Sequence, residues 1–69
     1  MSEQDDQVVG RTGTVSLAIS PERAGEVMIG IRGGTEAFTA VSDESIAKHT
    51  RVAVVDRLSA RTVSVTPLP

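Results

Sequence analysis

The chain has 69 residues, no cysteine and a formal net charge of −2, so it can form one small domain without a disulfide, a thiolate metal site or a cysteine nucleophile. Hydrophobic residues make up 39% and charged residues 23% of the chain, a balance typical of folded rather than disordered proteins. No apolar run approaches the roughly 18 residues needed to cross a bilayer, and no signal-peptide pattern opens the chain, so the sequence predicts a soluble domain.

The first seven residues differ from the rest in charge and pattern. Glu3, Asp5 and Asp6 place three of the nine acidic residues there, and the segment shows no hydrophobic periodicity. We therefore expect residues 1–7 to form a disordered acidic lead-in, ahead of one folded domain over residues 8–69.

Alternation of apolar and polar residues predicts five strands, at residues 14–19, 26–31, 36–41, 51–58 and 62–66. In the first of them Val15, Leu17 and Ile19 share one face. Pro21 ends that strand because it has no N–H to donate to a β-ladder. The glycine-rich segment 32–35 predicts the turn of a hairpin between the second and third strands.

One segment between the third and fourth strands, residues 42–47, has a helical pattern. Ser42 can cap a first turn, and Asp43 and Glu44 suit the positive end of a helix dipole. Five short strands with one short helical turn between strands 3 and 4 predict an all-β fold, a small five-stranded OB-type (oligonucleotide/oligosaccharide-binding) β-barrel, because closure removes unpaired strand edges. A small SH3-like barrel, with a similar strand count, is the alternative.

Strand parity predicts which side chains fill the barrel. The predicted interior consists of Val15, Leu17, Ile19, Val27, Ile29, Val52, Val54, Val63 and Val65. Side chains of opposite parity, among them Met28 and Val55, should face outward. Because methionine and arginine are enriched where proteins meet, we hypothesise a docking patch for a protein partner that contains Met28, Val55 and Arg57.

A possible catalytic motif is the S-x-x-K spacing of Ser45 and Lys48. One helical turn would place both side chains on one face, where a lysine of lowered pKa could activate the serine. Lowering that pKa needs burial, and an oxyanion hole needs a supporting layer that so short a chain scarcely supplies. We therefore expect that the chain is not an enzyme. A small enzyme built on Ser45 and Lys48 is the third-ranked hypothesis, after two binding functions described below.

Two further features have structural explanations. Residues 10–13 match the G-x-x-G loop of KH nucleic-acid-binding domains, but that loop joins two helices, so we interpret the glycines as a strand bend or bulge. His49 is the one histidine, and its spacing from Asp43 and Glu44 matches no metal site. We expect neither a metal nor a cofactor.

Nucleic-acid binding is disfavoured by charge and by composition. After the acidic segment, seven Lys and Arg residues stand against six Asp and Glu residues, and Phe38 is the only aromatic residue. Single-strand binders use aromatic platforms, each worth about 1–3 kcal/mol per stacked base. For these reasons we rank an OB module that binds nucleic acid or oligosaccharide second, as the alternative function.

The glycine and valine pattern also carries a family resemblance. The segments VGRTGTV at residues 9–15, SP at 20–21, GEV at 25–27, FTAVS at 38–42, RVAVVD at 51–56 and VSV at 63–65, together with Ile46, resemble the soluble C-terminal domain of NfeD-like membrane proteins. The resemblance covers about residues 8–67. The family usually has a glycine just before the fourth strand, where this chain has His49, so we expect the entry to that strand to differ in shape.

This resemblance implies a function as well as an OB barrel. Such proteins resemble membrane-anchored helpers that act beside stomatin-, prohibitin- and flotillin-type scaffold proteins. It implies a non-enzymatic interaction domain of a bacterial NfeD-like protein, acting with such a scaffold in membrane organisation. The domain would be monomeric when isolated and cytoplasmic, joined to the bacterial cell membrane only through segments absent from this chain. Long members also carry a serine–lysine protease domain upstream of the barrel, which this chain lacks.

Overall fold

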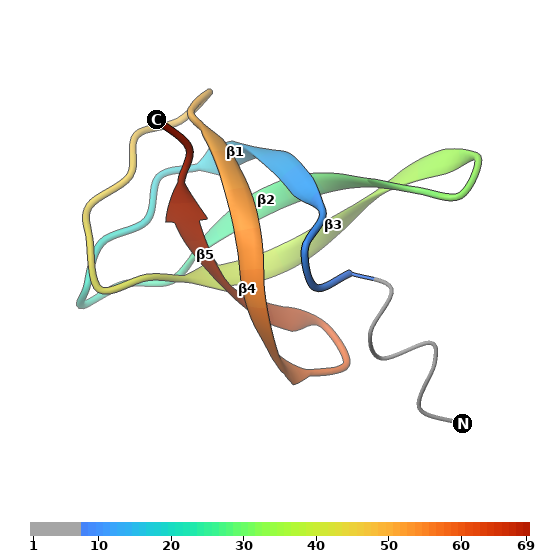
Figure 1. The fold of residues 1–69 in the computed structure, drawn as a ribbon. Helices are drawn as coiled ribbons and strands as arrows, with labels where there is room; N and C mark the ends of the chain where they lie inside the picture. The colour runs from blue at the N-terminus through green and yellow to red at the C-terminus, as the bar shows by residue number, and fades with distance from the viewer. Residues whose placement is uncertain (1–7) are drawn as a thin grey trace.

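Five strands close into a barrel in the computed structural model, which describes residues 8–69 (Figure 1). The strands are β1 (Thr12–Leu17), β2 (Gly25–Ile31), β3 (Gly34–Val41), β4 (Arg51–Ser59) and β5 (Thr62–Pro67). Their order around the barrel is β1-β2-β3-β5-β4, with β1 paired to β4. The β3–β5 pair is parallel and the other pairs are antiparallel. This is the order of an OB barrel, so the predicted all-β OB-type fold is confirmed. The expected lead-in at residues 1–7 lies outside the described residues.

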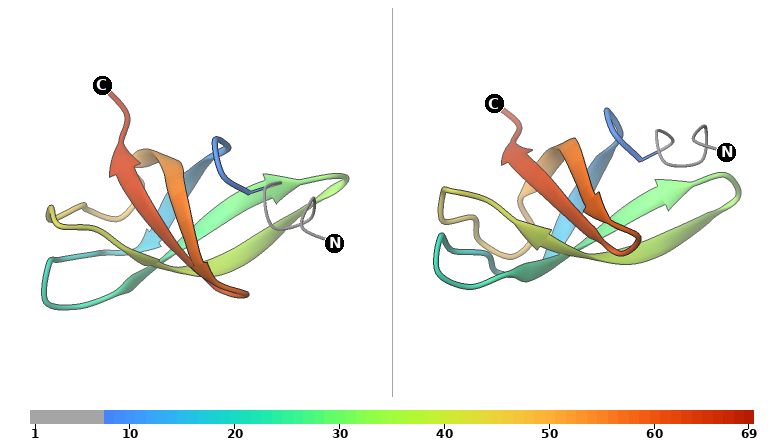
Figure 2. Two further views of the ribbon diagram at one scale, coloured as in Figure 1. Left: turned by 60° about the horizontal axis from the view of Figure 1, so that its bottom comes forward. Right: turned by 90° about the horizontal axis from the view of Figure 1, so that it is seen from below.

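The β2–β3 hairpin extends beyond the rest of the barrel (Figure 2). Its two-residue loop, Arg32 and Gly33, has positive φ values of 29° and 77°. Two-residue loops of this kind match the right-handed twist of the strands that they join. The predicted hairpin turn is therefore confirmed.

The core confirms the predicted strand parity with one exception. Its buried side chains are Val8, Val15, Ile19, Val27, Ile29, Phe38, Ala40, Ile46, Val52, Val54, Val63 and Val65. All predicted interior residues except Leu17 are among them. Parity in the first, second, fourth and fifth strands thus identified most of the core.

Leu17 was expected inside the barrel, but its side chain is 58% exposed. The register between β1 and β2 shifts here, because Val15 pairs with Val27 whereas Leu17 pairs with Glu26. A β-bulge of this kind inserts one residue and reverses which side chains point inward. The prediction for Leu17 is wrong because the bulge breaks the alternation.

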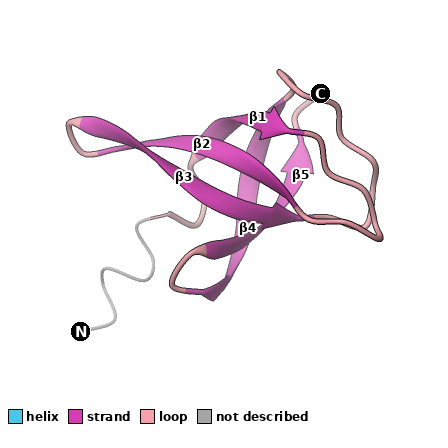
Figure 3. Cartoon of the chain, turned by 180° about the vertical axis from the view of Figure 1, so that it is seen from behind, coloured by secondary structure: helices cyan, strands magenta, loops and turns pink. Residues whose placement is uncertain are grey.

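The predicted helical turn between β3 and β4 is also wrong. Figure 3 shows strands and loops but no helix among the described residues. The backbone N–H of Glu44 donates to Ser42 Oγ at 3.1 Å, in a side-chain turn rather than a helix cap. Ile46 exchanges backbone hydrogen bonds of 2.8 and 2.9 Å with Ile19, which keeps this part of the loop extended. Within residues 8–69 no helix has the length and apolarity needed to cross a membrane.

Candidate protein-docking surface

Val55 lies on the outside of the barrel, in β4. Its side chain is 53% exposed, whereas that of Val54 is buried. Val54 pairs with Val65 of β5 and Asp56 pairs with Ser64, so Val55 is the extra residue of a second β-bulge. The outward position that parity predicts for Val55 is confirmed.

Met28 lies on a different part of the barrel from Val55. It pairs with Thr14 of β1 and with Ala37 of β3, and it is half-buried. Thr14 pairs in turn with Arg51, so β1 separates Met28 from β4. Val55 lies four residues beyond Arg51, which adds about 13 Å at roughly 3.3 Å per residue. The structure does not bring Met28 and Val55 together.

Arg57 is also turned away from Val55. It pairs with Val63, whose side chain is in the core, so the bulge moves Arg57 to the inner parity of β4. The Arg57 guanidinium donates through Nε to the Ser59 carbonyl at 3.2 Å and through Nη2 to the Ala60 carbonyl at 2.9 Å. These bonds hold it against the β4–β5 turn. The three predicted residues do not share one surface, and a binding role for each stays a prediction.

An open groove of about 470 Å³ lies beside Val55. It is lined by Pro21, Val41, Ser42, Asp43, Val55, Ser64, Val65 and Thr66. These residues come from β3, β4, β5 and two loops, and only the barrel order makes them neighbours. Sequence reasoning therefore missed the groove, and the one signal that pointed toward it was the outward parity of Val55.

Hydrogen bonds hold the first of those loops, between β1 and β2. The N–H of Ser20 donates to the Arg23 carbonyl at 2.9 Å, and the N–H of Arg23 donates back at 3.1 Å, around a turn that contains Pro21. Ile19, just before this turn, is tied to Ile46 of the β3–β4 loop by the paired bonds described above. The two loops thus support each other at one end of the barrel.

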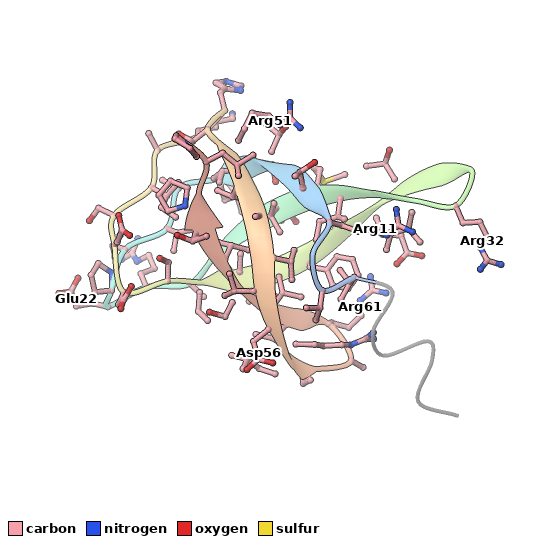
Figure 4. The ribbon with its side chains drawn as sticks, viewed as in Figure 1. Arg11, Glu22, Arg32, Arg51, Asp56 and Arg61 are labelled. Carbon is pink, nitrogen blue, oxygen red and sulfur yellow. The ribbon has the colours of Figure 1, made fainter. Side chains whose placement is uncertain are left out.

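One acidic residue lines the groove, and three more stand next to lining residues in the chain. Among the described residues that line it, Asp43 is the only charged one, and it lies in the turn that the Ser42 hydroxyl holds. Glu44 follows Asp43, Glu22 follows Pro21, and Asp56 follows Val55. Figure 4 shows Glu22 at the loop end of the molecule and Asp56 on β4. The same view places Arg11, Arg32 and Arg61 toward the other end.

The catalytic and metal-binding alternatives gain no support from the described residues. Ser45 and Lys48 are both exposed in a loop without helical structure, so the helical spacing that their pairing required is absent. No group of three or more His, Cys, Asp or Glu side chains within residues 8–69 could hold a metal ion.

The single aromatic ring is not available for base stacking. Phe38 is only 4% exposed, and the Arg61 guanidinium carbon lies 5.8 Å from the centroid of its ring. A buried ring cannot serve as a platform for nucleic-acid bases.

Gly13 and His49 show how backbone shape is set around β1. A Cβ at Gly13 would overlap the carbonyl oxygen of Met28, so glycine allows the close approach of β1 to β2. Gly13 thus lies within a strand and not in a loop between two helices, and the register shift of β1 comes only after Val15, so Gly13 is not at a bulge. His49 has a φ of 79°, a conformation that glycine adopts most readily. The backbone at the entry to β4 therefore has a conformation that glycine, the usual residue of the family there, also adopts.

Comparisons with known proteins agree with this geometry. The family model of the NfeD C-terminal domain matches residues 12–66. The soluble domain of the NfeD protein YuaF from Bacillus subtilis is 41% identical, with a TM-score of 0.77 over 93% of this chain and 76% of that chain. A search of curated proteins found no match.

Two further solved structures have the same fold. The C-terminal domain of stomatin operon partner protein 1510-C from Pyrococcus horikoshii is 27% identical, with a TM-score of 0.72 over 94% of both chains. The soluble domain of a Corynebacterium glutamicum membrane protein implicated in regulation of membrane protease activity has a TM-score of 0.69 over 87% of this chain and 90% of that chain. At 22% identity, the latter shows the fold alone. With its family match over residues 12–66, the chain belongs to the NfeD C-terminal domain family.

Proposed function

We propose that this domain is a non-enzymatic protein-interaction domain of an NfeD-like membrane protein, and that it acts with a stomatin-, prohibitin- or flotillin-type scaffold protein in membrane organisation. The observation that carries the proposal is the similarity to the C-terminal domain of a stomatin operon partner protein, over 94% of both chains. Proteins encoded in one operon are made together, which favours a physical partnership between them.

The distribution of polar groups supports an interaction role over a catalytic one. Among the described residues, every fully buried side chain is hydrophobic. Acids, bases and nucleophiles with chemistry tuned by burial are typical of active sites. The absence of such groups from the buried part of residues 8–69 supports a function carried by the outer surface.

Attachment to the membrane is part of the same proposal. The full-length protein reaches the bacterial cell membrane through segments outside this chain, and the domain is a cytoplasmic monomer. The 41% identical neighbour is the soluble domain of the NfeD protein YuaF, one part of a longer protein, which supports membrane association.

Cross-linking in native membranes tests this function. The full-length protein and the stomatin-type protein of the same organism are co-expressed, and the cross-linked yield is compared with that of a version lacking residues 8–69. We expect the cross-link to disappear with the domain, and to stay absent when an unrelated small barrel replaces it. An unchanged yield without the domain would contradict the proposal.

A further inference from the structure

The groove beside Val55 combines apolar walls with a hydroxyl-bearing floor. Val41 and Ser64 face each other in the parallel β3–β5 pair, and Val55 lies on the other side of Ser64, at the bulge in β4. Thr66 lies two residues beyond Ser64 in β5, and it lines the groove together with Pro21 of the β1–β2 loop. Hydroxyls can bond to peptide N–H and C=O groups, while the walls offer aliphatic contact. This combination suits an extended polypeptide segment.

The charge around the groove indicates which side chains the bound segment should carry. Asp43 lines the groove, and Glu44 and Asp56 are next to lining residues in the chain. No described lysine or arginine lines it, and Arg23 instead lines a neighbouring pocket together with Glu22. A surface with one sign of charge attracts the opposite sign and repels its own. The groove therefore favours a cation beside an aliphatic group.

The groove is formed before any partner binds. The bulge fixes Val55 outward, and the paired bonds between Ile19 and Ile46 hold the two loops together. The Ser42 hydroxyl orders the turn that carries Asp43. A preorganised surface loses little conformational entropy on binding, so even a short segment can be held there.

We propose that this groove binds an extended segment of a partner protein in which an aliphatic residue stands next to a lysine or arginine. The aliphatic side chain packs between Val41 and Val55, and the cation lies near the Asp43 carboxylate. This proposal rests on the proposed function, because it gives the partner's contact site on the domain.

Other occupants fit the charges less well. Anionic lipid headgroups would meet the carboxylate of Asp43, which lines the groove and repels them. A second copy of the chain would have to present its own basic and aliphatic pair, such as Arg57 and the adjacent Leu58, whose side chain is 54% exposed. Sedimentation of the purified domain tests this occupant. A dimer that the substitution Val55→Asp dissociates would assign the groove to a second copy and overturn the proposal.

Peptide titration followed by ¹⁵N–¹H NMR tests the groove directly. The probes are acetyl-Gly-Leu-Lys-Val-Lys-Gly-amide and the same peptide with glutamate in place of both lysines. We expect the lysine peptide to shift amide signals at residues 41–43, 55 and 64–66, and the glutamate peptide to leave them in place. Equal effects of both peptides, shifts confined to another face, or no shifts would overturn the proposal.

Matched variants locate the contacts. Val55→Asp should weaken binding of the lysine peptide about tenfold or more, as expected for a central apolar contact. Asp43→Asn should weaken it about threefold and remove most of its salt dependence, since an exposed ion pair is weak and screened. Leu58→Asp is the control, because Leu58 is similarly exposed in the same strand and outside the groove. It should change affinity by less than about twofold.

A second variant distinguishes loss of folding from loss of peptide binding. If the NMR spectrum of Val55→Asp lost its dispersion, Val55→Ser would replace it, because serine removes the aliphatic contact without adding a charge. Unchanged affinity in a folded variant would overturn the proposal.

A binding measurement with the stomatin-type protein distinguishes a failure of the groove proposal from a failure of the proposed function. If that protein binds wild type and Val55→Asp equally, the groove proposal is wrong and the proposed function stands. If the lysine peptide occupies the groove while the stomatin-type protein does not bind, the proposed function is wrong and the groove serves another basic–aliphatic partner.

Discussion

His49 holds a backbone conformation that is costly for a residue with a side chain. Its φ is 79°, and its N–H donates to the Val15 carbonyl at 2.7 Å, two residues before β4 begins. The left-handed conformation costs a non-glycine residue roughly 1–2 kcal/mol, part of which glycine gives back through its greater freedom in the unfolded chain. We predict that His49→Gly raises the free energy of unfolding by about 0.5–1 kcal/mol.

Urea denaturation of the purified domain measures this change. His49→Val is the control, because a β-branched residue is strongly disfavoured at positive φ and should lower the free energy of unfolding. A His49→Gly protein no more stable than wild type would show that the backbone angle carries no strain.

Single residues also show what sequence alone can predict. Val27 and Ile29 are buried as predicted, because the alternation of β2 is unbroken. Leu17 and Arg57 differ from expectation because each follows a bulge, and a bulge leaves no clear mark in an amino-acid pattern. The outward position of Val55 was predictable, but its neighbours in the groove were not.

The junction of β1 and β2 depends on a glycine. A Cβ at Gly25 would overlap the carbonyl oxygens of Leu17 and Ala18, where β1 leaves its bulge. These are backbone atoms that cannot rotate away, so Gly25→Ala should lower the free energy of unfolding by about 1–3 kcal/mol, the usual cost of overpacking. Gly34 has no atom near its Cβ position and is the matched control.

Thermal and urea unfolding of both variants check this prediction. Gly34→Ala should stay within about 0.5 kcal/mol of wild type, as surface substitutions do. Equal stability of the two variants would mean that the close approach at Gly25 can relax, and that the bulge does not need a glycine.

The β3–β4 loop shows how tertiary contacts override a local signal. Ser42, Asp43 and Glu44 fit a helix start, yet the Ser42 hydroxyl accepts the Glu44 N–H in a turn that does not continue as a helix. Ile46 then pairs with Ile19, a residue distant in sequence. Helix propensity depends only on residues that are close in sequence, so the bridge between Ile19 and Ile46 could not be predicted from the pattern.

At the scale of the whole molecule, the strands were predictable and the groove was not. Alternation located all five strands to within about two residues, which is the usual uncertainty of element ends. The parallel β3–β5 pair brings Val41 next to Ser64, and this contact depends on barrel closure. Surfaces built across several strands follow from topology, which local patterns do not contain.

The near balance of positive and negative charges and the burial of the Phe38 ring both predict that the domain does not bind nucleic acid. Phe38 is in the core, and outside the acidic first seven residues the basic residues exceed the acidic ones by only one. We expect no change in fluorescence anisotropy when labelled single-stranded DNA or RNA meets the domain at about 0.15 M salt. Micromolar binding that weakens steeply with salt would instead support the alternative OB function.

We propose that a scaffold protein docks on this domain through the groove beside Val55. The most direct measurement is calorimetric titration of the soluble region of the stomatin-type protein into three proteins: wild type, Val55→Asp and Leu58→Asp. We predict saturable binding to wild type and Leu58→Asp, and binding at least about tenfold weaker to a folded Val55→Asp. Equal binding to all three would contradict the groove as the docking site, and no binding to wild type would contradict the scaffold as the partner.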